Sequence, residues 1–147
     1  MRSIAVLALS AAAATSAAQE PMNQQRLHEI IAANGSNVRV EGSMAVFQFG
    51  GVPLLCISDP NADRMRIIAP VKRVDEATPQ EILAAMRANF HTALDVRYAI
   101  SEGVIFAAFI HPLSPLSAEQ VASAIRQVAS ARETFGDSYS GGTLLFR

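Results

Sequence analysis

The residue types that could do chemistry begin with Ser138, which lies in the block Gly136-Asp137-Ser138. A serine nucleophile needs a base within hydrogen-bond reach, a group that orients the base, and donors for the oxyanion. Nine residues follow Ser138, and none of them is histidine. A structural role explains the block better, because Phe135 completes an apolar helical stripe and Gly136 then offers the left-handed conformation in which helices often end. We predict a helix end here, with a hydrolase that uses Ser138 as the alternative.

The block resembles the Gly-Asp-Ser motif of the GDSL hydrolases and, more faintly, the Gly-Asp-Ser-Gly-Gly motif of the chymotrypsin-like proteases. In GDSL hydrolases this motif lies near the start of the domain, and the acid and the histidine come near its end. The proteases need an earlier histidine block and two barrels, for which this chain is too short. These resemblances therefore do not imply catalysis by the serine.

The three histidines of the chain have no catalytic or metal-binding spacing. They are His28, His91 and His111, and no two of them form a His-x-x-x-His pair. His91 comes at the end of a predicted helix, where a histidine is favourable for the helix dipole without any further role. We predict that none of the three is catalytic or binds a metal.

A second possible metal site is a calcium-binding loop in residues 59–70. Asp59, Asn61 and Asp63 stand at alternate positions, as in the first half of such a loop. The sixth position is Arg64 where glycine is needed, and the twelfth is Pro70 where a bidentate glutamate is needed. This segment is better explained as a turn between two strands, and the sequence predicts no metal and no other cofactor.

Cys56 is the only cysteine, so no intramolecular disulfide can form. It lies in the apolar run VPLLCIS, which predicts a buried thiol that behaves as a small apolar side chain. Stability must then come from packing alone.

Composition and charge define the class of protein. Residues 1–18 carry Arg2, a short apolar run and a small-x-small step that ends at Ala18, which is the pattern of a secretory signal peptide. We expect cleavage after Ala18 and a periplasmic or secreted protein without a membrane anchor. The rest suits a single domain over residues 19–136 and a C-terminal tail over residues 137–147. With 11 basic and 13 acidic residues left, nucleic acid is not an expected partner.

Hydrophobic periodicity and turn residues predict three helices and six strands. The expected order is a helix over 21–34 with a left-handed end at Asn34-Gly35, strands over 37–40, 44–49, 52–58 and 64–71, a helix from the capping residue Thr78 to Phe90, strands over 94–100 and 104–110, and a helix from the capping residue Ser117 to Phe135. Such short connections between strands demand antiparallel neighbours. The fold class is α+β, a mainly antiparallel sheet of five to six strands with helices packed on one face.

Two faces are assigned to the core from the same patterns. On the second helix the predicted inner residues are Ile82, Leu83, Met86 and Phe90, and on the fifth strand they are Leu94, Val96, Tyr98 and Ile100. The sixth strand is a continuous apolar run, so the hairpin of the last two strands is expected at the centre of the sheet.

Arginines on the strands are the candidate binding residues. Arg64 and Arg66 share one face of the fourth strand, and Arg97 lies on the outward face of the fifth. If these strands are neighbours, three guanidinium groups line an open sheet surface that can meet carboxylates of a partner. The alternative is a solvated face whose charges keep the sheet soluble.

A family resemblance covers residues 22–135. It rests on a strand that ends in a Pro-bearing loop, a capped helix with LAAMRANF, the strand LDVRYAI, an apolar strand that ends in HPLS, and a last amphipathic helix. These features resemble the YbjN-type family of bacterial sensory transduction regulators, whose fold is that of the type III secretion chaperones. The resemblance implies no enzymatic activity, and it implies dimerisation and the binding of extended segments of other proteins.

The sequence therefore predicts a non-enzymatic, exported module that forms a homodimer and binds a protein or peptide through its sheet face or an edge strand. One alternative is an envelope carrier of a small apolar ligand, with a pocket between the last helix and the sheet lined by Phe106, Phe109 and Val128. The other alternative is the hydrolase that uses Ser138.

Overall fold

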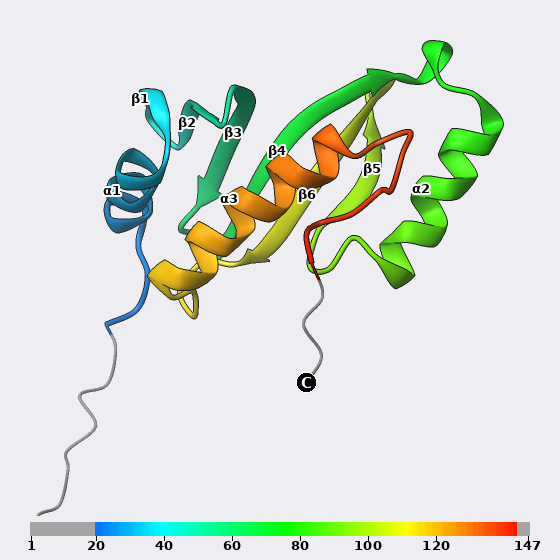
Figure 1. Cartoon of the computed structure of the whole chain (residues 1–147). Helices are drawn as coiled ribbons and strands as arrows, with labels where there is room; N and C mark the ends of the chain where they lie inside the picture. Colours follow the sequence, from blue (N-terminus) through cyan, green and yellow to red (C-terminus); the bar gives the residue numbers. More distant parts are fainter. Residues whose placement is uncertain (1–19, 144–147) are drawn as a thin grey trace, which may run out of the picture.

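A six-stranded antiparallel sheet with three α-helices forms the architecture of residues 20–143, the part of the chain that the computed structural model describes (Figure 1). The elements are α1 (Gln24–Asn34), β1 (Ser36–Glu41), β2 (Met44–Phe49), β3 (Val52–Asp59), β4 (Arg64–Arg73), α2 (Pro79–His91), β5 (Arg97–Ser101), β6 (Val104–Pro112) and α3 (Ala118–Glu133). A short 3₁₀ turn, Val74–Glu76, precedes α2. The predicted α+β class and the order α-ββββ-α-ββ-α are confirmed. None of the described helices is long and apolar enough to cross a membrane.

The strand order in the sheet is β1-β2-β3-β4-β6-β5, and every neighbouring pair is antiparallel. The predicted central position of the last hairpin is wrong. β6 pairs with β4 over nearly its whole length, but β5 pairs only with β6 and forms the edge of the sheet. The burial of β5 agrees with an edge position, because Tyr98 is the only buried residue of this strand.

Helix α3 crosses the sheet diagonally and covers β3, β4 and β6, while α1 lies beside it (Figure 1). Its predicted apolar stripe is confirmed over Val121, Ile125 and Val128, which are fully buried, whereas Phe135, its predicted last member, lies beyond the helix and is half-buried. The three buried residues pack in the core with residues from the strands and from α1, which include Leu27, Ile31, Phe47, Leu54 and Ile67. Because α1 and α3 share this side, we call it the inner face of the sheet.

Both predicted helix caps form, because capping depends on residues close in sequence. Thr78 and Glu81 form a complete capping box at the start of α2, and Ser117 and Gln120 form one at the start of α3. The predicted left-handed end of α1 is wrong, because Gly35 has φ −103°. A glycine is needed there for space instead, since a Cβ at Gly35 would lie 2.7 Å from the Phe47 ring.

The orientation of α2 differs most from the sequence-based expectation. Leu83, Met86 and Phe90, predicted to face the core, are 52%, 60% and 87% exposed. The helix instead turns Ala85 and Ala88 inward. Ile82, also predicted to face the core, is half-buried.

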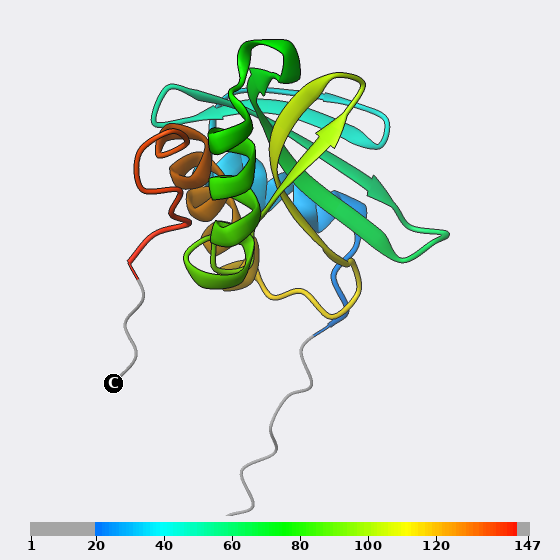
Figure 2. The same cartoon turned by 90° about the vertical axis from the view of Figure 1, so that its right-hand side faces the viewer.

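The cause is a hydrogen-bonded contact between α2 and the edge strand. The side-chain amide of Asn89 accepts from the backbone N–H of Tyr98 at 2.7 Å and donates to the Tyr98 carbonyl at 3.1 Å. Asn89 thus satisfies the backbone of β5 where no further strand follows, and this fixes which side of α2 meets the sheet. Figure 2 shows α2 standing beside the hairpin of β5 and β6.

The predicted inner face of residues 94–100 is correct only in part. Val96 and Tyr98 are buried, whereas Ile100 is 57% exposed at the edge of the sheet. Leu94 is half-buried with φ +58° and precedes the strand, which begins at Arg97. Ile100 lies on the edge strand, beside which the structure places no further strand within residues 20–143.

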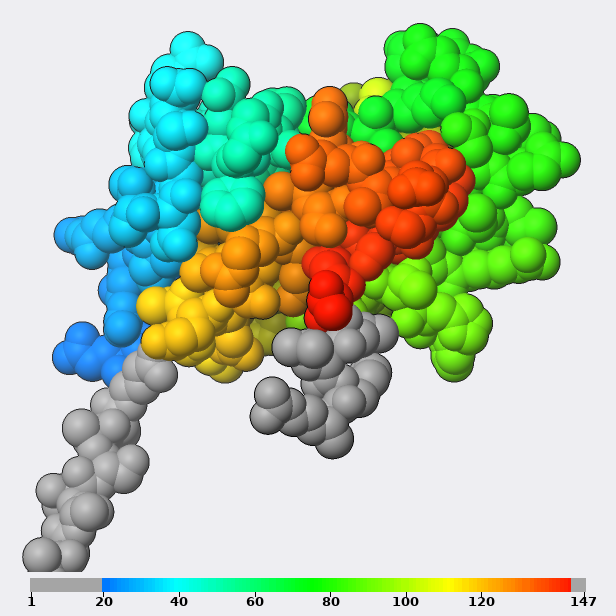
Figure 3. Space-filling model, in the orientation of Figure 1, coloured from blue at the N-terminus to red at the C-terminus, as the bar shows by residue number. Residues whose placement is uncertain are grey.

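After α3, residues 134–143 turn back and lie between α3 and α2 (Figure 3). The helix ends at Glu133, two residues before the predicted end, where the Thr134 hydroxyl donates to the Ser130 carbonyl at 2.8 Å. Gly136 has φ +88°, so the expected left-handed glycine follows the helix. Thr92, at the end of α2, donates through its hydroxyl to the Tyr139 carbonyl at 2.8 Å. Part of the segment expected as a tail therefore packs on the domain.

Candidate functional site

The face of the sheet turned away from α1 and α3, here called the outer face, carries an apolar band. Cross-strand register defines one row across all six strands: Arg39, Val46, Leu55, Ile68, Ala108 and Arg97. Directly opposed residues share a face, so the whole row lies on the outer face. Arginines stand at both ends of the row, and the residues between them are apolar. We use the name apolar band for Val46, Pro53, Leu55, Ile68, Pro70 and Phe106, which line a shallow hollow of about 270 Å³ together with Leu54.

Next to the apolar band lies a second row, in which Ile57 pairs with Arg66 and Arg66 pairs with Ile110. Ile110 is 60% exposed, so the outer face remains apolar up to the arginine. An antiparallel sheet with one solvated face normally places polar side chains there. The contiguous apolar surface is therefore the feature of this face that needs an explanation.

Exposed arginines flank the apolar band on the outer face. Arg39, Arg64, Arg66 and Arg97 are exposed, and none of them forms an ion pair within residues 20–143. Glu41 and Asp59 are the acidic residues at outward strand positions of the paired register. Four arginines against two carboxylates leave this face positive, although the whole chain has a formal charge of −1.

The three arginines named from the sequence do share the outer face, but their strands are not neighbours. Arg64 and Arg66 lie on β4 and Arg97 on β5, with β6 between them. Two strand spacings, roughly 10 Å, therefore separate the two positions. The Nη1 atom of Arg97 donates to the carbonyls of Leu94 and Val96, each at 2.6 Å, which orients the guanidinium at the start of β5.

A second uncovered apolar surface was missed by sequence reasoning. It comprises Leu83, Met86 and Phe90 of α2 with Ile100 of β5, and we call it the α2 ridge. Beside it lies a hollow of about 120 Å³, lined by Ile82, Ala85, Met86, Tyr98, Ala99, Ile100 and Ile105. Leu83, Met86 and Phe90 are three and four residues apart, which predicts an apolar stripe along one side of α2. This spacing does not show whether the rest of the protein covers the stripe.

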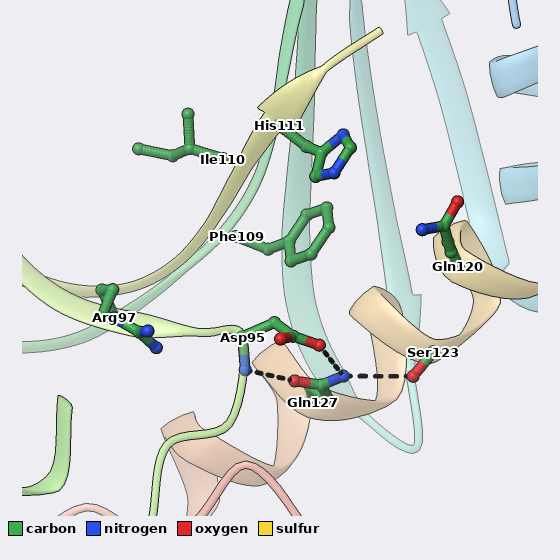
Figure 4. A pocket seen from close by; sticks show the side chains of 8 residues that line it. All are labelled: Asp95, Arg97, Phe109, Ile110, His111, Gln120, Ser123 and Gln127. Carbon is green, nitrogen blue, oxygen red and sulfur yellow. Dashed lines mark hydrogen bonds between the residues drawn. The ribbon is translucent and has the colours of Figure 1, made fainter. Parts of the chain in front are cut away.

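A polar hollow of about 320 Å³ opens where β5 begins, between β6 and α3 (Figure 4). Gln127 holds it together: its Oε1 accepts from the backbone N–H of Asp95 at 3.0 Å, and its Nε2 donates to the Asp95 carboxylate and the Ser123 hydroxyl, both at 3.1 Å. The ring of His111 stacks on Phe109 with centroids 5.7 Å apart. No hydrogen bond joins His111 to Asp95 in the described part of the chain, so this hollow contains no acid–base pair.

Ser138 and His91 line the same shallow hollow of about 240 Å³, together with Arg87 and Thr92. The structure records no hydrogen bond of the Ser138 hydroxyl within residues 20–143, and no carboxylate is among the residues that line the hollow. In the part of the chain that the structure describes, Ser138 and His91 are therefore not joined to each other or to a group that orients the base.

The apolar-ligand pocket predicted between α3 and the sheet is wrong. Phe109 and Val128 are buried in the inner layer, whereas Phe106 opposes Pro70 and lines the hollow on the outer face. Side chains alternate along a strand, so residues 106 and 109 of β6 cannot point to the same side. The three residues do not enclose a common cavity.

The residues of the apparent calcium loop serve the turn. The Asp59 carboxylate accepts from the backbone N–H groups of Asn61 and Ala62 at 3.0 and 3.2 Å. Asp63 accepts from the Ser114 backbone N–H at 2.7 Å and the Ser114 hydroxyl at 2.9 Å, and these bonds lower the pKa of the carboxyl group. Within residues 20–143 no group of three potential metal ligands comes together.

Burial accounts for the two other ionisable residues singled out in the sequence. Cys56 is fully buried, and burial raises the pKa of its thiol to about 12. The Nε2 atom of His28 is buried without a hydrogen-bond partner in the described residues, and burial lowers the pKa of this imidazole. Both shifts favour the neutral form, which suits packing rather than catalysis.

Comparison with known proteins gives a structural likeness without a sequence match. No protein-family model matches the chain, and no curated protein matches it. A matching solved structure is that of the HopA1–SchA chaperone–effector complex, with a TM-score of 0.58 and 11% sequence identity over 74% of this chain and 88% of that chain. The fold thus resembles that of a type III secretion chaperone, as predicted.

Proposed function

We propose that this protein is a non-enzymatic binding module that holds a segment of another protein against the outer face of its sheet. The observation that carries the proposal is the apolar band, left uncovered by the helices of residues 20–143. Monomeric soluble proteins seldom leave contiguous apolar surface exposed unless something binds there. Arg64, Arg66 and Arg97, exposed on the same face, supply the polar contacts that orient a partner.

The likeness to a secretion chaperone supports this role, because the similar structure is a complex of a chaperone with an effector protein. It supports a protein partner and leaves the identity of that partner open to experiment. Membership of the YbjN-type family and export through a signal peptide over residues 1–18, which lie outside the described residues, are parts of the same proposal. The partner would then be a protein of the cell envelope or the medium.

A second copy of the chain binds through the α2 ridge in this proposal. A two-fold symmetric contact brings the same surface patch of both copies together, so a patch without charge suits self-association. Leu83, Met86, Phe90 and Ile100 meet that condition. The outer face does not, because a symmetric contact there would bring two patches that both carry unpaired arginines against each other.

Photo-crosslinking tests the proposed function directly. A photoreactive residue at position 110, on the outer face, should give covalent adducts with a partner protein in cells that produce the full chain. The same residue at position 126, exposed on α3 on the opposite side, should give none. Equal adducts at both positions, or none at position 110, would contradict the proposal.

A further inference from the structure

We infer that the segment bound on the outer face is an extended stretch of protein whose apolar residues are bracketed by carboxylates. This inference rests on the proposed function and adds the chemical class of the partner. It comes from the positions of the four exposed arginines relative to the apolar band, which the register of the sheet defines.

The row that crosses the sheet sets the length of the segment. It begins at Arg39 on β1 and ends at Arg97 on β5, with four apolar residues between. Neighbouring strands are about 4.8 Å apart, so the row spans no more than roughly 24 Å. At roughly 3.3 Å per residue, about seven extended residues cover this span. Carboxylates just outside such a stretch reach both arginines.

Charge at the two ends of β4 gives the segment a direction across the face. At one end Arg64 and Arg66 are exposed without an ion pair in residues 20–143. At the other end the basic residues are already neutralised, because Lys72 binds Glu81 and Arg73 binds Asp75, each at 3.0 Å. Both unpaired arginines of β4 therefore lie at the end beside Ile57 and Ile110, and the basic residues at the other end of this strand are already paired.

The cost of covering arginine explains why a neutral or basic segment fits poorly. A partner that lies on the apolar band removes water from Arg66, and a guanidinium that loses water without gaining an acceptor is destabilising. A carboxylate of the partner compensates for the lost hydration, because it forms paired hydrogen bonds with the planar guanidinium. A lysine at the same place adds repulsion between like charges.

The test uses two labelled peptides and fluorescence anisotropy. Each peptide has about seven residues in which apolar residues alternate with serine, and the flanks are two glutamates on each side in one peptide and two lysines in the other. The full protein should bind the glutamate peptide about tenfold more tightly than the lysine peptide. In Arg66→Glu this preference should disappear or reverse, whereas Arg126→Glu, the same charge change on α3, should keep it.

The outcomes separate this inference from the proposed function. Equal binding of both peptides would overturn the charge preference, while crosslinking at position 110 would still support a protein-binding face. Failure of both peptides to bind, with adducts at position 110, would overturn the inference alone. Failure of both experiments would remove both proposals.

A membrane surface is the alternative partner of the outer face. Binding of the protein to vesicles with anionic headgroups tests this alternative. Binding to such vesicles that depends on Arg66, without peptide binding, would overturn the inference. Thermal melting of Arg66→Glu must remain close to that of the unchanged protein. If it does not, Ile110→Ser replaces it as the outer-face variant and should weaken binding of the glutamate peptide.

Discussion

Arg66 and Ile110 oppose each other across β4 and β6, on the side of the sheet that α1 and α3 leave uncovered. Both side chains are exposed, and they mark the place where the apolar part of the outer face meets its unpaired positive charge. The α2 ridge lies elsewhere and carries apolar side chains alone. In the proposed function, these two surfaces of different chemistry serve two different binding events.

Replacing Phe90 by aspartate should abolish self-association. Phe90 is 87% exposed at the end of α2, so the change removes an apolar contact with a second copy and costs the isolated fold less than about 0.5 kcal/mol. Light scattering coupled to size exclusion should give a dimer for the unchanged protein and a monomer for Phe90→Asp.

The matched control is Ile110→Asp, which changes an exposed apolar residue on the outer face. It should remain dimeric and lose partner binding instead. A monomeric unchanged protein, or a dimer that survives Phe90→Asp, would show that the α2 ridge does not join two copies.

Replacing Gln127 by leucine should destabilise the fold by about 1–3 kcal/mol, because the backbone N–H and carboxylate of Asp95 lose their partner. Gln127 is only 8% exposed, so water cannot freely take its place. Ser123→Ala removes a single acceptor from the same group and should cost no more than about 1 kcal/mol. Urea unfolding gives both values, and equal costs would mean that Gln127 does not hold the segment before β5.

Replacing Asp63 by asparagine should lower stability at neutral pH and have little effect in acid. Hydrogen bonds from Ser114 hold the pKa of this carboxyl group below its usual value of 3.8 in the folded protein. A lowered folded pKa contributes stability above the unfolded pKa, and this contribution is lost as the pH falls through the folded value. Asparagine still accepts the left-handed conformation of this residue, φ +49°.

Melting curves at pH 7 and below pH 4 check the Asp63 prediction. The difference between Asp63→Asn and the unchanged protein should be present at neutral pH and shrink in acid. Asp137→Asn is the control, because the Asp137 carboxylate makes no hydrogen bond recorded within residues 20–143 and should give no such difference. A constant difference across the range would contradict the assigned role of the carboxylate.

Cys56 should not react with a thiol reagent while the protein is folded. The side chain is fully buried and its pKa is raised to about 12, so neither access nor a thiolate is provided near neutral pH. A coloured disulfide reagent should react with one thiol per chain only after denaturant is added. A second thiol introduced as Ile110→Cys, at an exposed position, should react at once. Rapid reaction of Cys56 in the folded protein would contradict the buried assignment.

The helix N-caps, which depend on neighbours in sequence, could be predicted. The capping boxes at Thr78 and Ser117 each join residues three apart, and both form as expected. The stripe of α3 could also be predicted, because a long amphipathic helix has only one side to bury.

The orientation of α2 could not be predicted in the same way. Asn89 fixes it by bonding to the backbone of Tyr98, and that contact exists only because β5 forms the edge of the sheet. Strand order depends on which distant segments pair, and the local pattern of β5 does not contain this information. The same missing information explains why Ile100 was expected inside.

The sequence predicted the arginines of the candidate site but not its apolar band. Alternation along β4 and β5 correctly placed Arg64, Arg66 and Arg97 on one face, but the apolar band beside them was missed. A signal was present: Leu55, Ile68 and Phe106 occupy the outward positions of their strands, where an antiparallel sheet with a solvated face should carry polar residues. A strand that is apolar on both faces predicts a central position in the sheet, and a strand with an uncovered apolar face has the same pattern.

Methyl NMR of the unchanged protein, with and without the partner that crosslinking identifies, tests the central claim most directly. If the outer face binds the partner, the methyl signals of Leu55, Ile68 and Ile110 should shift, while those of Ile125 in the core and Leu83 on the α2 ridge should stay in place. Shifts confined to Leu83 and its neighbours on α2, with Ile68 and Ile110 unchanged, would contradict the claim that the apolar band of the outer face is the binding surface.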